Sequence, residues 1–212
     1  ITKQLQSDCQ RYLPIAPNKI IHLKYGIQIP NKVINTKEGR KELYNRFNLD
    51  DKLLTIGVFS RIEEQKGQHL VVEALNSINN KAIQLLIIGH CMDNKYMDKL
   101  NNMIDEFKLQ KQISITSFIE SPMELMPLLD LVILPTYEET FGLVVAESML
   151  MGTPVIGSNA GGVPEIIEDK INGLLFEPKN YKSLKEEIVR ISNSLELRKK
   201  LSYNAKFHIN GK

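Results

Sequence analysis

Two runs of consecutive apolar residues constrain the fold of this chain more than any other feature. Residues 53–59 and 85–88 are apolar almost without a break. A strand with one face in water alternates apolar and polar residues, whereas a strand covered on both faces is apolar throughout. We therefore expect a parallel sheet that is buried between two layers of helices.

Strand-like runs alternate with helical patterns along the chain. Strands are predicted at 19–25, 53–60, 83–89, 113–118, 131–135, 154–158 and 173–176, and helices at 38–47, 67–78, 95–107, 123–129, 142–151, 163–169, 181–194 and 195–209. Such alternation implies right-handed crossovers. The predicted fold class is therefore α/β, with a Rossmann-like, doubly wound parallel sheet whose ligands bind outside the carboxyl ends of the strands.

Composition and charge exclude several classes of protein. The 212 residues carry a net charge of +2 without a block of Lys or Arg, so no nucleic-acid partner is expected. Cys9 and Cys91 have neither metal nor redox spacing, which fits a reducing compartment. The sequence shows no signal peptide, and no apolar run approaches the ~18 residues of a membrane span.

The chain divides into three predicted parts. Residues 1–18 are polar and contain Pro14 and Pro17, so they are interpreted as the tail of a preceding domain and a linker. Residues 19–194 are predicted to form the ligand-binding domain, and residues 195–212 a C-terminal helix. Because the chain begins at Ile1, we expect it to be a piece of a longer protein.

The turn between the predicted strand 131–135 and helix 142–151 suits an anionic, polyhydroxylated ligand. Glu139 lies in this turn, and Glu147 lies in a helix that is otherwise apolar except for Ser148. The first helical N–H groups, from Leu143 and Val144, are available to an anion and carry the positive end of the helix dipole. The structural alternative is that Glu139 only stabilises the helix start and that Glu147 bonds to backbone in the core.

A second turn, after strand 53–60, carries two cations. Arg61 and Lys66 lie five residues apart, immediately before Gly67. An arginine fork and a lysine point charge can together clamp a diphosphate. The alternative is an exposed loop in which these cations pair with Glu63 and Glu64.

The remaining motifs are weaker. The glycine-rich turn 158–165 is interpreted as a tight structural turn rather than a phosphate cradle, and His90 as a surface-loop residue. The histidines show no triad or metal spacing, and no two aspartates lie two apart. We therefore expect neither a metal nor a cofactor.

These motifs, in this order, resemble the C-terminal donor-binding domain of the glycosyltransferase family 4 enzymes, which have the GT-B fold. The matching stretches are 25–27, 61 with 66–67, 135–147 with its two glutamates eight residues apart, 152–156, 160–165 and 172–173. The match covers nearly the whole chain. The chain departs from the family pattern at Ser60, at His90 with Cys91, and at Ile119, where glycine is common.

The resemblance implies a role for each candidate residue. Arg61 and Lys66 would hold the donor diphosphate and stabilise the leaving nucleotide, and Glu139 would hold hydroxyl groups of the sugar; these three are the candidate catalytic residues. The remaining donor-binding candidates are Glu147 for the ribose, Phe141 and Gly142 for the sugar, Leu143 and Val144 for the phosphates, and Phe118 and Ile119 for the base.

The resemblance also implies an activity. It is metal-independent, retaining transfer of a sugar from a nucleoside diphosphate sugar to a saccharide or glycolipid acceptor, in bacterial surface polysaccharide synthesis. The expected location is the cytoplasm, including the inner face of the membrane, with any membrane association made by a missing N-terminal domain that binds the acceptor. This fragment alone is expected to be inactive, and Leu201 and Phe207 of the last helix are expected to be exposed where that helix would cross to the missing domain.

Two other classes remain open. One is a different enzyme on a similar sheet, such as a nucleotide-sugar epimerase or a hydride-transfer domain. The absence of Gly-x-Gly-x-x-Gly argues against a nicotinamide cofactor. The other is a non-catalytic module that binds a sugar nucleotide.

Overall fold

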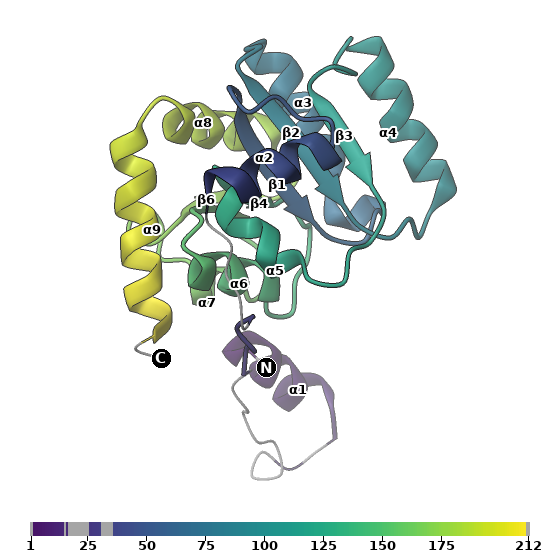
Figure 1. The fold of residues 1–212 in the computed structure, drawn as a ribbon. Helices are drawn as coiled ribbons and strands as arrows, with labels where there is room; N and C mark the ends of the chain where they lie inside the picture. Colours follow the sequence, from purple (N-terminus) through teal and green to yellow (C-terminus); the bar gives the residue numbers. More distant parts are fainter. Residues whose placement is uncertain (1, 15, 17–25, 31–35, 211–212) are drawn as a thin grey trace.

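A computed structural model describes residues 2–14, 16, 26–30 and 36–210 of the chain. Six parallel strands form one sheet in the order β3-β2-β1-β4-β5-β6 (Figure 1). Their bounds are Leu54–Phe59 (β1), Ile83–Ile88 (β2), Ile113–Thr116 (β3), Leu131–Leu134 (β4), Val155–Ser158 (β5) and Leu174–Phe176 (β6). The chain order reverses between β1 and β4, which defines a topological switch point. The predicted doubly wound α/β fold is confirmed.

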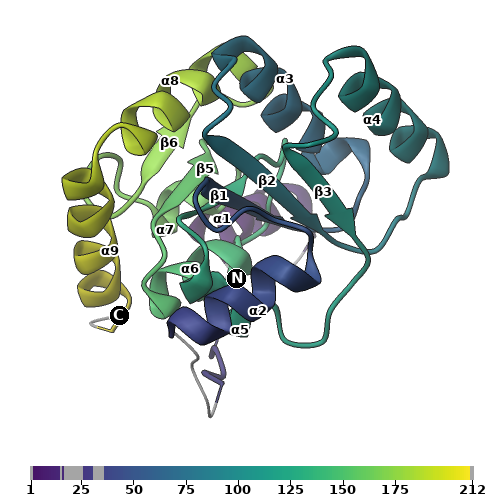
Figure 2. The ribbon, with the colours of Figure 1, turned by 45° about the horizontal axis from the view of Figure 1, so that its top comes forward.

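Helices cover both faces of the sheet (Figures 1 and 2). One face packs on α3 (Gln68–Ile78), α4 (Asn94–Glu106) and α8 (Tyr181–Ser192). The other packs on α2 (Lys37–Arg46), α5 (Pro122–Leu125), α6 (Leu143–Met151) and α7 (Val163–Ile166). The helices α1 (Lys3–Tyr12) and α9 (Leu195–Asn210) lie at the periphery, and short 3₁₀ turns occupy η2 (Glu64–Lys66) and η3 (Met126–Leu128). Helix α1 lies within residues 1–18, whose assignment to a preceding domain and a linker stays a prediction.

The two apolar runs form the central strands. Every residue of β2 is buried, and β1 is buried from its second residue onward. The two strands pair in parallel from Leu54 with Ile83 to Phe59 with Ile88. Alternate residues of each strand enter the two apolar clusters on opposite faces, which explains why these runs lack polar alternation.

Three predicted elements need comment. The helix predicted at 123–129 is split, because Pro127 has no N–H for a continuing α-helix, and a 3₁₀ turn follows α5. The helix predicted at 163–169 stops at Ile166, since Ile167 is extended and Asp169 bridges to Gly173. The strand predicted at 19–25 lies outside the described residues.

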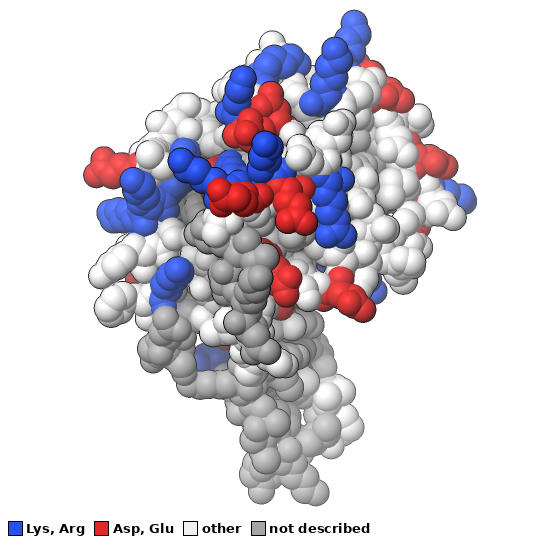
Figure 3. Space-filling view, in the orientation of Figure 1, with Lys and Arg blue, Asp and Glu red and all other residues white. Residues whose placement is uncertain are grey.

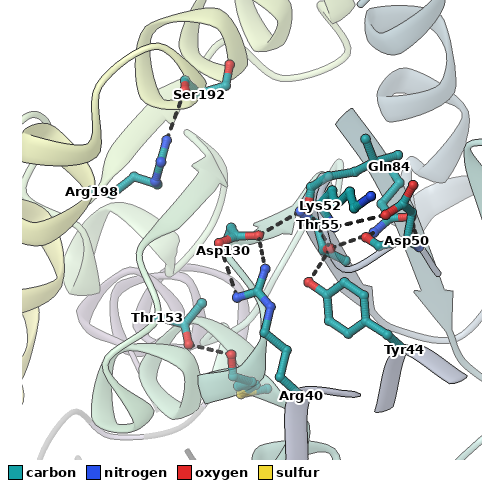
Figure 4. A network of polar contacts seen from close by, with 12 residues as sticks. Arg40, Tyr44, Asp50, Lys52, Thr55, Gln84, Asp130, Thr153, Ser192 and Arg198 are labelled. Carbon is teal, nitrogen blue, oxygen red and sulfur yellow. Dashed lines mark hydrogen bonds and ion pairs between the residues drawn. The ribbon is translucent and has the colours of Figure 1, made fainter. Parts of the chain in front are cut away.

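A polar network locks the amino ends of the strands (Figure 4). Asp130, just before β4, accepts the Thr55 N–H at 2.8 Å and pairs with Arg40 of α2 at 2.8 Å. The Gln84 side chain of β2 donates to the Thr55 hydroxyl at 2.9 Å. The hydroxyl groups of Tyr44 and Thr55 form a further hydrogen bond, in which either can be the donor. The buried polar groups of β1 and β2 are thereby satisfied, which leaves the opposite, carboxyl edge for a ligand site.

The expectation for the last helix was half right. Phe207 is 71% exposed, as predicted, but Leu201 is fully buried. Leu201 and Ala205 lie on the side of α9 that packs within this domain, chiefly against α6, and the Ser202 hydroxyl donates to the Gly152 carbonyl. One side of α9 therefore belongs to the core of this domain, and the side that carries Phe207 is exposed. The division at residue 195 stays a prediction.

No helix within the described ranges is both long and apolar enough to cross a membrane. On the face drawn in Figure 3, Lys and Arg side chains lie among Asp and Glu side chains over the upper part of the molecule. The described surface on this side therefore shows mixed charge, in keeping with the small net charge of the sequence.

Candidate active site

The turns that follow β1 and β4 meet at the switch point. Gly67 has a left-handed φ of 68°, and a Cβ there would lie 2.1 Å from the Pro135 carbonyl oxygen. The Tyr137 N–H donates to the Gln65 carbonyl at 2.8 Å. This close approach needs glycine at position 67, and it brings Lys66 to the turn that carries Glu139.

A third turn supports Glu139 from behind. The Gly162 N–H donates to the Glu139 carbonyl at 2.8 Å. Gly161 has a φ of 54°, and a Cβ there would lie 1.9 Å from the same carbonyl oxygen. The glycine-rich turn after β5 thus packs closely against the backbone of Glu139, as expected for a tight structural turn.

Lys66 and Glu139 form an ion pair at the centre of the site. The Lys66 Nζ lies 3.0 Å from the Glu139 Oε2, and both side chains are less than one-fifth exposed. The second carboxylate oxygen accepts the Thr140 N–H at 3.2 Å. A cation and a carboxylate, 73 residues apart in sequence, are therefore held together beside the start of α6.

Arg61 follows the structural alternative in part. Its guanidinium pairs with Glu63 at 2.9 Å and its side chain is 59% exposed. Glu64 pairs instead with Lys99 of α4. The guanidinium group has five N–H donors, and the contact with Glu63 uses only some of them. Arg61 therefore retains N–H donors for a ligand.

A pocket of about 240 Å³ lies between these groups. It is lined by Phe59, Ser60, Arg61, Lys66, Leu134, Glu139, Thr140, Phe141, Gly142, Leu143 and Val144. Helix α6 begins after Gly142 without a side-chain cap, so its first N–H groups face the same space as the two cations. The structure thus brings together seven of the predicted site residues, whose roles stay predictions: Arg61, Lys66, Glu139, Phe141, Gly142, Leu143 and Val144.

Glu147 lies one turn deeper in α6 and does not line this pocket. It is half-buried, and burial raises the pKa of its carboxyl group. Among the described residues it makes no hydrogen bond or ion pair, so the alternative of a carboxylate bonded to backbone in the core is not what the structure has. A half-buried carboxylate without a partner costs stability.

Phe118 and Ile119 also lie outside the pocket lining. The Phe118 side chain is 64% exposed, and Ile119 packs on the apolar cluster of the α6 face. Their strand ends at Thr116, two residues earlier than predicted, so they belong to a connecting loop. The structure leaves their proposed contact with a base as a prediction.

Several contributors to the site were missed from the sequence, among them Phe59, Ser60 and Leu134 of the pocket lining. Thr140 lines the pocket, although it lies inside the motif that was singled out. Gln68 is fully buried at the start of α3 and donates to the Ser60 hydroxyl at 2.9 Å and to the Arg61 carbonyl at 2.7 Å. It therefore fixes the backbone that carries Arg61. Its polar side chain, directly after Gly67 in a helix with an apolar face, was the available signal.

His69 contacts the turn that carries Glu139 from inside the domain, through Tyr137. It is buried, and its Nδ1 and Nε2 atoms lie 2.9 Å and 2.7 Å from the hydroxyl groups of Tyr96 and Tyr137. The Tyr96 oxygen already accepts the backbone N–H of His69, so its own proton can go to Nδ1. The neutral ring then donates from Nε2 to Tyr137, two residues from Glu139.

This arrangement predicts acid sensitivity. Burial lowers the pKa of His69 from its ordinary value of 6.5. The unfolded chain therefore takes up a proton that the folded chain resists, and the free energy of unfolding falls as the pH drops below about 6.5. Urea unfolding at about pH 7.5 and about pH 5.5 should show a smaller loss for His69→Gln than for the wild type. Equal losses in both proteins would contradict a buried neutral histidine.

The other histidine expectation concerns His90, which lies exposed in the loop after β2, as predicted. A Cβ on the preceding Gly89 would lie 1.7 Å from the Ser60 carbonyl oxygen, so this loop packs on the turn that carries Arg61. Within the described ranges, no three His, Cys, Asp or Glu side chains are grouped as metal ligands.

Fold and site together define a Rossmann-like domain with a cationic pocket at the carboxyl edge of its sheet. The sequence model of the family described as glycosyl transferases group 1 matches residues 39–208, and the chain belongs to this family.

Relatives and solved structures agree with this assignment. The O-antigen biosynthesis glycosyltransferase WclY of Escherichia coli is 29% identical over 198 residues, which are 93% of this chain and 51% of that protein. A glycosyltransferase from Rickettsia africae has a TM-score of 0.92 at 24% identity, over 100% of this chain and 57% of that one. Anabaena HepE in complex with UDP and glucose has a TM-score of 0.79 at 25% identity, over 83% of this chain and 48% of that one.

The likeness to the Rickettsia africae structure confirms the predicted fold, a Rossmann-like parallel sheet that corresponds to one half of a GT-B fold. The chain spans about half the length of the curated relatives it matches.

Proposed function

We propose that this chain is the donor-binding half of a retaining, metal-independent glycosyltransferase of family 4. The observation that carries the proposal is the pocket in which two cations, Arg61 and Lys66, face the uncapped start of α6. Cations and free helical N–H groups together favour a diphosphate. The donor is a nucleoside diphosphate sugar, and HepE, a similar protein, was solved with UDP and glucose.

The chemistry of such a transfer concentrates charge on the leaving group. The bond between the anomeric carbon and the diphosphate oxygen breaks, and the electron pair stays on the diphosphate. The anomeric carbon forms a new bond to the acceptor oxygen, whose proton is released. Arg61, Lys66 and the N–H groups of Leu143 and Val144 stabilise the added negative charge, and such preorganised donors are commonly the largest catalytic contribution.

Glu139 has a second role in this scheme. Its carboxylate pairs with the Lys66 ammonium group at a separation of 3.0 Å. A bound diphosphate competes for the Lys66 ammonium group, which leaves a Glu139 oxygen free to accept hydrogen bonds from sugar hydroxyls. Diphosphate binding and sugar binding are thereby coupled through one ion pair.

The proposal also covers the acceptor and the cellular setting. WclY acts in O-antigen biosynthesis by its name, which supports a saccharide or glycolipid acceptor in bacterial surface polysaccharide synthesis. We place the enzyme in the cytoplasm, including the inner face of the membrane. A preceding domain would bind the acceptor, so this fragment alone would transfer little sugar.

A titration of wild type and Glu147→Ala with UDP and with pyrophosphate tests the donor site. The wild type should bind UDP and not NAD. In the variant, UDP affinity should fall by about 1.5–3 kcal/mol, the usual contribution of a hydrogen bond to a charged group, and pyrophosphate affinity should stay within about twofold. Because Glu147 lacks a partner among the described residues, its loss should not lower the free energy of unfolding. Equal losses for both ligands would instead indicate a structural glutamate.

A further inference from the structure

A second cavity, of about 500 Å³, adjoins the cationic pocket. The two spaces share Arg61, Lys66, Glu139 and Thr140 in their linings. The second cavity is therefore within reach of a ligand whose diphosphate lies against the two cations. Its volume falls within the usual range of small-molecule sites.

The lining of this cavity is polar. The residues that it adds to the shared four are Thr2, Asp8, Gln65, Glu138, Gly161 and Gly162. Within the described part of the chain, no aliphatic or aromatic side chain larger than threonine lines it. Hydroxyl, carboxylate and amide groups bond hydroxyl groups of a ligand, whereas a base or a lipid would need apolar or aromatic walls.

Two of these residues belong to the N-terminal segment, which is docked on the site. Thr2 is only 2% exposed, and the Lys3 N–H donates to the Glu165 carboxylate of α7 at 2.9 Å. A Cβ on Gly162 would lie 2.3 Å from the Thr2 methyl group, so the absence of a side chain at Gly162 makes room for Thr2. This contact fixes the start of α1 on the turn that supports Glu139, and it brings Asp8 to the cavity wall.

We propose that the sugar group of the donor occupies this second cavity and that Asp8, carried by α1, accepts hydrogen bonds from its hydroxyl groups. The inference rests on the proposed donor site and extends it to a residue outside the family's matched segment, which begins at residue 39. Glu139 and Asp8 then contact the sugar from two elements that are far apart in the sequence. The ligand class is a nucleotide-linked pyranose, recognised through its hydroxyls.

The test compares UDP with UDP-sugars in calorimetric titrations of the 212-residue chain. The sugar nucleotide is the one that the wild type binds most tightly among UDP-glucose, UDP-galactose and UDP-N-acetylglucosamine. Asp8→Ala should lower affinity for that ligand by about tenfold and for UDP by less than about twofold. Asp8→Asn, which keeps one acceptor oxygen and the side-chain shape, should give a smaller loss. Gln10→Ala, an exposed change on the same helix, should change neither affinity.

Each other outcome overturns a different claim. If the wild type binds neither UDP nor any of the three UDP-sugars, the donor site itself is wrong. If the wild type binds UDP but Asp8→Ala weakens both ligands equally, or neither, then Asp8 does not contact the sugar, and the donor site stands without it. Circular dichroism of each variant checks that α1 and the sheet remain folded.

Discussion

Lys66→Ala is expected to weaken UDP binding by about 1.5–3 kcal/mol, which is the usual contribution of a hydrogen bond to a charged group. The Lys66 side chain is mostly buried in the pocket lining, and it faces the start of α6 across the space that a diphosphate would fill. The variant also leaves Glu139 without its cation, and that carboxylate then repels the incoming phosphates. Isothermal calorimetry with UDP measures the loss.

The same variant should keep the fold. Each side chain of the ion pair is less than one-fifth exposed, so its loss should cost more than that of a surface pair. Glu139 nevertheless keeps its hydrogen bond from the Thr140 N–H and lines the pocket, where water can solvate its carboxylate. Lys99→Ala is the matched control, because it removes an ion pair of similar length, 2.9 Å to Glu64, on an exposed surface outside the pocket lining. The control should bind UDP like the wild type. Equal UDP affinities for Lys66→Ala and Lys99→Ala would remove Lys66 from the diphosphate clamp.

Gly67→Ala is expected to lower the free energy of unfolding by about 2–4 kcal/mol, through left-handed backbone strain and overpacking. Gly67 has a φ of 68°, and an added Cβ would lie 2.1 Å from the Pro135 carbonyl oxygen. The contact is to backbone at the end of a central strand, so no flexible side chain can yield. Urea unfolding monitored by circular dichroism measures the change.

Gly67→Ala should also weaken UDP binding, because the turns that carry Lys66 and Glu139 must move apart. Gly26→Ala is the control for stability, since a Cβ there would meet no atom within 4 Å. It should change the free energy of unfolding by less than about 0.5 kcal/mol, as is usual for surface changes. Unfolding curves for Gly67→Ala that match those of Gly26→Ala would mean that the two turns are not in contact.

The adjacent positions 66 and 67 thus separate two effects. Loss of Lys66 should affect the ligand and spare the fold, since its side chain ends in the pocket. Loss of Gly67 should affect both, since the backbone contact sets the width of the site. A result in which both variants lose only stability would favour a structural turn over a donor site.

The sequence predicted which segments lie at the carboxyl edge, and it named most of the pocket lining. Strand ends are visible in a sequence, because an apolar run stops and polar or glycine residues follow. Arg61, Lys66 and Glu139 were each found in this way, at the ends of β1 and β4. Glu147 was singled out because a lone carboxylate stands out in an apolar helix, but its position outside the pocket lining was not foreseeable.

The misses have physical causes. Leu201 was expected to be exposed, but the face that it shares with Ala205 packs within this domain, which no local pattern of α9 revealed. His69 and Asp8 have partners or cavities formed by segments far away in the sequence, and Gln68 bonds to Ser60 and Arg61 across the turn after β1. Their surroundings depend on which loops meet, and side-chain type alone does not encode that.

The sequence by itself determined the parallel sheet and the positions of the chemical groups along it. A strand that is buried on two faces is a continuous run of apolar residues, and such a run can be recognised in the sequence. Only the tertiary structure decided which groups meet. The Lys66–Glu139 pair spans 73 residues, and Thr2 fills the room left by Gly162 160 residues later. Strand order and the close approach of turns at glycines create these contacts, and both are properties of the assembled sheet.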